Sequence, residues 1–154
     1  MLSLRSIGWS AFCLLGMQVA ALSAADYYHA RQYYSDWHSH PNKSYSYRHY
    51  YYKPTPTYSG YKHHYVIQTP KDPKHYYYYN PYKQKYWGRC PANSDGQPLY
   101  SLLAEKDRKA TLDEIPETAF PKPSKLPPIP ESKDGALLDL PPDDAPNAPG
   151  VPQS

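Results

Sequence analysis

The chain has 154 residues, a formal net charge of +3, 19 tyrosines, 19 prolines and only two cysteines. Between residues 26 and 100 large aliphatic side chains are so scarce that a conventional hydrophobic core is excluded, and whatever folds there must be small. Residues 26–100 hold ten Lys/Arg and four Asp/Glu, whereas residues 101–154 hold six Lys/Arg and ten Asp/Glu. A basic aromatic half can face its own acidic tail, so net charge identifies no partner.

The first 25 residues have the order of a secretory signal peptide. Arg5 precedes an apolar run over residues 7–22, and a Ser-Ala-Ala sequence then supplies the small side chains that signal peptidase requires. We expect cleavage after Ala25 and a mature chain that is secreted or held in the periplasm or cell envelope. The alternative is a retained anchor, but the run is shorter than the about twenty residues that span a bilayer.

Cleavage also decides the cysteine chemistry. It removes Cys13 and leaves Cys90 as the single thiol in an oxidising compartment, so an intramolecular disulfide is excluded. Cys90 can pair with another chain to give a dimer, stay free, or be buried. One thiol also excludes a zinc ribbon and a Cys-x-x-Cys redox motif.

Residues 26–57 are rich in tyrosine and histidine and almost without aliphatic side chains. Tyrosine doublets and a triplet recur there without a fixed period. Because such a segment offers little to bury, the sequence predicts a disordered, low-complexity arm.

Residues 58–120 are predicted to form a small all-β module, an antiparallel meander of three to four strands. Four aromatic or β-branched runs alternate with turns rich in Pro, Asn, Asp and Gly; they lie at residues 61–68, 75–79, 85–90 and 99–104. Alternation within the runs is weak, because successive tyrosines occupy both faces. Residues 101–110 also have high helix propensity, and we favour a strand that leads into a loop.

A short helical turn is predicted near residues 112–120. Thr111 and Glu114 have the spacing of a capping box, and Pro116 prevents a long helix. Phe120 and the aliphatic residues of this segment are expected to pack against one face of the meander.

Residues 121–154 contain ten prolines, with five acidic residues against three lysines. This composition predicts a disordered or polyproline II tail, so most of the chain outside the β module is expected to be disordered. The alternative is a segment whose scattered leucine and isoleucine residues lie across the aromatic surface.

Three strings in a fixed order carry a resemblance: YYNPYKQKYWGRC, then LYSLLAEKDRKATLDEIPETAFPKP, then PPIPESKDG followed by LPPDDAP. Together they resemble an uncharacterised family of small secreted proteins from planctomycete-type bacteria, with a Tyr-rich first part and a Pro-rich acidic end. The resemblance covers about residues 50–146. It implies export and no particular activity, fold or ligand.

Seven histidines raise the question of a metal site. The candidates are His63, His64 and His75, since His63 could meet His75 across the turn at residues 70–73. A zinc or copper site needs three or four convergent ligands, and the chain has neither HExxH nor paired cysteines. Solvated histidines are the favoured interpretation, and no cofactor is expected.

An aromatic surface is the other candidate site. Tyr77, Tyr79 and Trp87 lie among basic residues, a composition suited to stacking on bases or sugar rings. Export argues against nucleic acid as the partner and favours polysaccharide. Trp87 could equally be a core residue of the sheet.

Catalytic motifs are missing from the sequence. It has no Gly-x-Ser-x-Gly elbow and no Gly-rich phosphate loop, and Cys90 lacks a helix N-terminus that would lower its pKa. The sequence therefore predicts an exported, non-enzymatic structural or interaction protein of the cell envelope or extracellular matrix, with protein or polysaccharide partners. The alternative is an aromatic/His surface that binds a glycan or a divalent metal.

Overall fold

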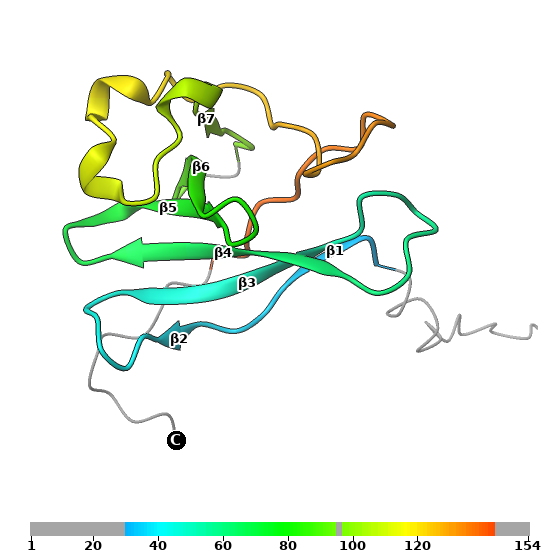
Figure 1. Ribbon diagram of the computed structural model, residues 1–154, viewed down its shortest axis with the longest axis horizontal. Coiled ribbons are helices and arrows are strands. Elements are labelled where there is room, and N and C mark those ends of the chain that lie inside the picture. The colour runs from blue at the N-terminus through cyan, green and yellow to red at the C-terminus, as the bar shows by residue number, and fades with distance from the viewer. Residues whose placement is uncertain (1–29, 95–96, 144–154) are drawn as a thin grey trace, which may run out of the picture.

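The computed structural model describes residues 30–94 and 97–143. These residues form one antiparallel sheet in the order β1-β3-β4-β5-β6-β7, and β2 also pairs with β3 (Figure 1). The predicted antiparallel all-β class is confirmed, but three to four strands was wrong, since the sheet has seven. The expected signal peptide at residues 1–25 lies outside the described residues.

The strands are short at both edges of the sheet and long in its middle. Their bounds are β1 Gln32–Tyr34, β2 His38–Ser39, β3 Ser46–Tyr52, β4 Lys62–Thr69, β5 Asp72–Asn80, β6 Lys85–Pro91 and β7 Ser101–Leu102. Three 3₁₀ turns follow, η1 Glu105–Asp107, η2 Leu112–Glu114 and η3 Glu117–Ala119.

The described part of the predicted disordered arm, residues 30–57, is ordered and supplies β1, β2 and β3. Burial along β3 alternates strictly: Arg48, Tyr50 and Tyr52 are buried, while the side chains between them are half-buried. This period of two is that of a strand with two different faces. The expectation of disorder was therefore wrong for this segment, which supplies one edge of the sheet, β1 and β2, and the neighbouring strand β3.

Tyr50 and Tyr52 replace aliphatic residues in the core, and their hydroxyls find partners there. Tyr50 donates to the Gln32 side chain, and the Tyr52 hydroxyl lies 3.2 Å from Nε2 of His64. A buried polar group costs little when it is hydrogen-bonded. A segment without aliphatic side chains can then still form a packed strand.

The predicted strands at 61–68, 75–79 and 85–90 correspond to β4, β5 and β6. The first turn is closed between Thr69 and Asp72, and in the second the Asn80 side chain accepts bonds from the next backbone amides. A register shift at Tyr78/Tyr79 places Trp87 and Gly88 together opposite Tyr78. The fourth predicted strand is reduced to β7.

One face of the sheet is covered by the C-terminal segment. We call residues 121–143 the strap. Ile129 and Leu138 of the strap are buried among aromatic residues of the sheet; the largest fully buried rings in this core are Tyr50, Tyr52, Tyr78 and Tyr100. In Figure 1 the strap runs as an orange trace beside the sheet.

Specific polar contacts hold the strap. Arg31 pairs with Asp134 at 2.7 Å and Lys62 pairs with Glu131 at 2.5 Å. The Tyr100 and Ser124 backbones form a bridge with two hydrogen bonds. Disorder was therefore wrong for residues 121–143, and the alternative of a segment lying across the aromatic surface is confirmed; residues 144–154 lie outside the described part.

The predicted helical turn is present as η2 and η3. The Glu114 carboxylate accepts bonds from the Thr111 hydroxyl at 2.7 Å and the Thr111 amide at 3.3 Å, which confirms the capping box. Phe120 lies edge-on to Tyr77 with ring centroids 5.8 Å apart. This segment covers one end of the second face of the sheet, and the rest of that face is open.

Candidate functional site

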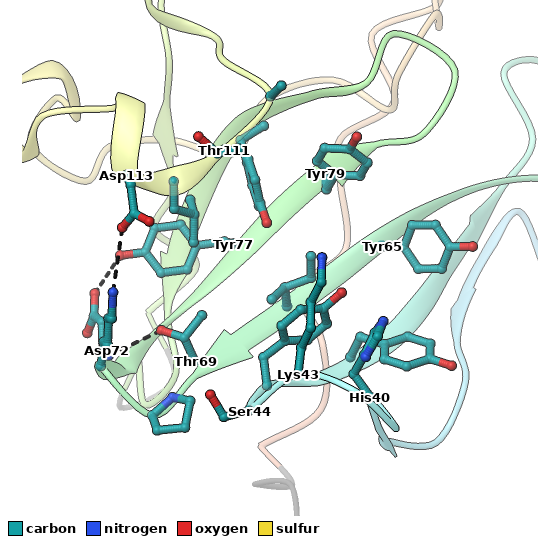
Figure 2. A pocket seen from close by; sticks show the side chains of 18 of the residues that line it. His40, Lys43, Ser44, Tyr65, Thr69, Asp72, Tyr77, Tyr79, Thr111 and Asp113 are labelled. Carbon is teal, nitrogen blue, oxygen red and sulfur yellow. Dashed lines mark hydrogen bonds and ion pairs between the residues drawn. The ribbon is translucent and has the colours of Figure 1, made fainter.

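The open face carries a groove of about 700 Å³. Figure 2 shows its floor on the strands, Thr111 and Asp113 on one side and His40, Lys43 and Ser44 on the other. The β4–β5 turn, with Thr69 and Asp72, closes one end. The walls therefore come from segments far apart in the chain, the β2–β3 connection and the η2 turn.

The floor of the groove is an aromatic ladder. His49 pairs with Tyr65, Tyr65 with Tyr79, and Tyr79 with Tyr86, each on the next strand from β3 to β6. Rings of His49 and Tyr65 are 4.9 Å apart, as are those of Tyr79 and Tyr86. With strands about 4.8 Å apart, four such residues span on the order of 15 Å.

The ladder is continued by rings along β1, β3 and β4. Tyr33 stacks on Tyr51 with centroids 4.7 Å apart, and Tyr51 lies 5.9 Å from His63. Tyr47 lies edge-on to Tyr65 at 5.8 Å. Ring faces and edges are thus presented over much of the open face.

Charged side chains at the turn end of the groove are engaged with neighbours. Burial alone would raise the pKa of Asp72, but hydrogen bonds from Tyr77 and His75 outweigh it and lower that pKa. Burial, together with the bond to Asp72, raises the pKa of Tyr77 to about 12. Lys71 lies 3.6 Å from Asp113. Asp72, His75 and Tyr77 therefore form a hydrogen-bonded network at this end of the groove, whereas Lys71 and Asp113 are exposed.

Histidines form a row on the same face. His49 lies 6.3 Å from His38 and 5.3 Å from His63, measured between ring centroids. Burial lowers the pKa of His49, and the neighbouring imidazoles His63 and His38 lower it further. His49, the central histidine of the row, is therefore neutral at pH 7, and a neutral ring suits stacking.

The three candidate metal ligands do not come together. His63 and His64 are adjacent on β4 and point to opposite faces. His75 lies near the other end of the β4–β5 hairpin, with Nδ1 2.7 Å from Asp72. Across residues 30–94 and 97–143, no group of three His, Cys, Asp or Glu side chains could hold a metal ion.

His64 occupies the covered core instead. Its side chain is 1 % exposed, and burial lowers its pKa to about 3, so it is neutral at physiological pH. The prediction that His63 meets His75 across the turn was wrong, because that turn is at residues 70–71 and His63 lies at the far end of β4.

The candidate aromatic contacts separate into two groups. Trp87 is 7 % exposed and packs in the covered core against Tyr78 and Tyr100, so it is a core residue. Tyr77 is 6 % exposed beneath Phe120, with only part of it lining the groove. Tyr79 is half-buried and belongs to the ladder.

Cys90 lies inside the covered core. It is 1 % exposed, and burial raises the pKa of its thiol to about 12. The thiol is therefore protonated and shielded from solvent. The sequence left three states possible for Cys90, namely a disulfide with another chain, a free thiol and a buried thiol. In the structure it is buried, so its sulfur is not accessible for an intermolecular disulfide in the folded state.

Sequence reasoning missed four groove residues, His49, Tyr47, Tyr65 and Tyr86. A signal for Tyr47 and His49 was present in the alternation of residues 46–52. Residues 46, 48, 50 and 52 belong to one face of the strand, and Tyr47, His49 and Tyr51 belong to the other. The shared position of all four on the groove depends on strand register, which no local pattern specifies.

Comparison with family models, with curated proteins and with solved structures finds no match for this chain. Within the described residues, no helix has the length and apolar character needed to cross a membrane.

Proposed function

We propose that this chain is an exported, non-enzymatic interaction protein of the cell envelope or extracellular matrix that binds a polysaccharide along its open face. The observation that carries the proposal is the ladder of His49, Tyr65, Tyr79 and Tyr86 on the floor of a groove of about 700 Å³. Aromatic rings stack on the apolar faces of sugar rings, and a row of them fits an extended chain better than a compact ligand.

The groove walls supply polar groups for sugar hydroxyls. Lys43, Ser44 and Thr111 line it with exposed side chains. Such a combination of apolar floor and few polar groups is typical of ligand sites. A divalent metal, the other half of the sequence-based alternative, gains no support from the described histidines, so we propose the glycan.

A binding role fits the chemistry of the groove better than catalysis. The Asp72 carboxylate accepts from Tyr77 and His75, whereas Asp113 forms only an exposed ion pair with Lys71 at 3.6 Å. General acid–base catalysis on a glycan needs two carboxyl groups on either side of the bond to be cleaved. The proposal of a non-enzymatic role rests on the missing catalytic motifs of the sequence and on the hydrogen bonds that hold Asp72.

Export and partner class come from the sequence. The leader at residues 1–25 and the resemblance to small secreted proteins support a location outside the cytoplasm, where polysaccharides are abundant and nucleic acid is not the expected partner. Fractionation tests this part: we expect the processed chain in the periplasmic, envelope or medium fraction, and recovery of the full precursor in the cytosol would contradict it.

Calorimetric titration tests the binding part. Soluble hexasaccharides of the cellulose, chitin and xylan types serve as probes, and we expect saturable binding of at least one. Tyr65→Ala and Tyr79→Ala each remove one ring of the ladder and should weaken binding about five- to tenfold, since a ring contact contributes about 1 kcal/mol.

Tyr58→Ala is the matched control. Tyr58 is 37 % exposed, lies in the β3–β4 connection and does not line the groove. Its removal should leave affinity unchanged. Equal losses in Tyr58→Ala and Tyr65→Ala, with all variants folded by circular dichroism, would place binding elsewhere.

A further inference from the structure

A second, smaller pocket lies on the covered side of the sheet and is unrelated to the glycan groove. Its volume is about 220 Å³. The ends of β4 and β6, the β5–β6 turn, η1 and the strap contribute its walls. Pro127, Pro128, Ile129 and Pro130 give it an apolar side, which is too small for a polymer and suits a single small molecule.

Two buried nitrogen atoms at this pocket have no hydrogen-bond partner among the described residues. They are Nδ1 of His64 and Nε1 of Trp87, on side chains that are 1 % and 7 % exposed and that both line the pocket. Leaving one buried polar group without a hydrogen bond costs about 1–3 kcal/mol. Two such groups at one pocket therefore call for an explanation. A bound polar group would remove this cost.

The hydrogen-bonding capacity of the two nitrogens indicates the kind of group. The Trp87 indole N–H can only donate. His64 is neutral, and when the Tyr52 hydroxyl donates to Nε2 at 3.2 Å, Nδ1 carries the proton and also donates. Two donors on residues that line one pocket fit an acceptor such as a carboxylate oxygen.

The charges around the pocket indicate an anion. Arg108 pairs with Glu105 at 2.6 Å, and Glu131 pairs with Lys62 at 2.5 Å. Lys83 and Lys85 also line the pocket, and neither has a carboxylate partner within the part of the chain that the structure describes. The positive charge of Lys83 contributes to lowering the pKa of His64. These two exposed lysines are therefore the cationic side chains of the pocket that could pair with a ligand.

We propose that this pocket binds a small monocarboxylate with an apolar body. The carboxylate accepts from His64 and Trp87 and faces Lys83 and Lys85, while the body packs against the proline-rich part of the strap. Because the strap forms one wall, the ligand holds the strap against the sheet, and binding stabilises the fold by mass action.

Amide-proton NMR at pH 7 tests the proposal directly. Sodium benzoate is titrated into the ¹⁵N-labelled protein, with benzyl alcohol as the neutral ligand of the same ring and sodium phosphate as an anion without an apolar body. We expect a saturable shift of the Trp87 indole N–H with benzoate, while the Trp37 indole stays in place. Benzyl alcohol and phosphate should bind at least tenfold more weakly.

Surface variants keep the test independent of folding. Lys83→Gln and Lys85→Gln together should weaken benzoate binding at least fivefold, whereas Lys122→Gln, exposed and away from the pocket, should leave it unchanged. Absence of a saturable Trp87 shift would overturn the proposal. Equal affinity for benzoate and benzyl alcohol would overturn the inference that the ligand is an anion. Phosphate binding as tight as that of benzoate would overturn the inference that the ligand has an apolar body.

Discussion

The hydroxyl groups of Tyr34 and Tyr78 lie 2.8 Å apart inside the covered core. Tyr34 donates its proton to the Asp139 carbonyl at 2.6 Å, so the Tyr78 hydroxyl donates to Tyr34. One tyrosine therefore links β1, β5 and the strap. Burial raises the pKa of both hydroxyls well above 10, which keeps them protonated and able to donate.

Tyr34→Phe should destabilise the fold by about 1–3 kcal/mol, because it removes the acceptor of the fully buried Tyr78 hydroxyl and the donor to the strap. Urea unfolding followed by circular dichroism measures this. Tyr58→Phe removes an exposed hydroxyl and should change stability by less than about 0.5 kcal/mol. Equal effects of the two substitutions would show that the Tyr34 link contributes nothing.

The strap gives a second test through two neighbouring leucines. Leu138 is fully buried, whereas Leu137 is 53 % exposed. Leu138→Ala should cost about 2–5 kcal/mol, because it leaves a cavity among aromatic rings, and Leu137→Ala should cost less than about 1 kcal/mol. Denaturant midpoints separate the two. A strap that does not pack on the sheet would give two small and equal effects.

The central hairpins could be predicted from the sequence because their signals are local. Asn80 and Pro81 mark a turn, and the runs beside them have aromatic and β-branched residues, so β4, β5 and β6 follow from turn chemistry and propensity. The edges of the sheet could not be predicted in this way. β2 and β7 have two residues each and exist only through their partners.

The strands of residues 30–57 were missed because a core was expected to need aliphatic side chains. Tyr50 and Tyr52 are each fully buried, and their hydroxyls reach Gln32 and His64, which lie 18 and 12 residues away in the chain. Partners at that distance are set by the fold and cannot be read locally. The same applies to the groove, whose ladder depends on the register of four strands.

The close approach of Gly88 to Tyr100 gives a third prediction. A Cβ at Gly88 would lie 2.5 Å from the Tyr100 hydroxyl and 2.7 Å from the Ser101 carbonyl oxygen. Gly88→Ala must therefore displace backbone as well as a ring, and we expect a loss of about 1–3 kcal/mol in urea unfolding.

Tyr100→Phe provides the comparison for this site. The buried Tyr100 hydroxyl has no hydrogen-bond partner among the described residues, so its removal should leave stability unchanged or raise it. In the Tyr100→Phe background Gly88→Ala should remain costly, because the added Cβ still meets the ring carbon Cε1 at position 100 and the Ser101 carbonyl oxygen. A Gly88→Ala protein as stable as the parent would show that the two elements are not in close contact.

Cys90 gives a prediction about reactivity. Since the thiol is buried and its pKa is raised to about 12 by burial, it should not react with Ellman's reagent in the native protein at pH 8. One equivalent should react after unfolding in guanidinium. Non-reducing electrophoresis of protein alkylated in the native state should show monomer, whereas rapid native labelling or a reducible dimer would place Cys90 at the surface.

His64 predicts how stability depends on pH. Burial, aided by the charges of His63, Lys62 and Lys83, lowers its pKa to about 3 in the folded state, against an ordinary value of about 6.5. Between these values the unfolded chain binds a proton that the folded chain does not, so stability falls as pH is lowered from about 6.5 towards 3. The limiting slope for one proton is about 1.4 kcal/mol per pH unit.

His64→Gln keeps a polar group for Tyr52 but cannot titrate. Unfolding free energies measured from pH 7 to pH 4 should therefore fall less steeply in this variant, even though its stability at pH 7 is lower. His49→Gln is the comparison, since the half-buried His49 has its pKa lowered in the same direction by burial and by neighbouring histidines. It should remove a smaller part of the slope. Parallel pH profiles for His64→Gln and the parent would mean that His64 is solvated in the folded protein, and the pocket beside it would then have water, rather than a ligand, as the partner of its imidazole.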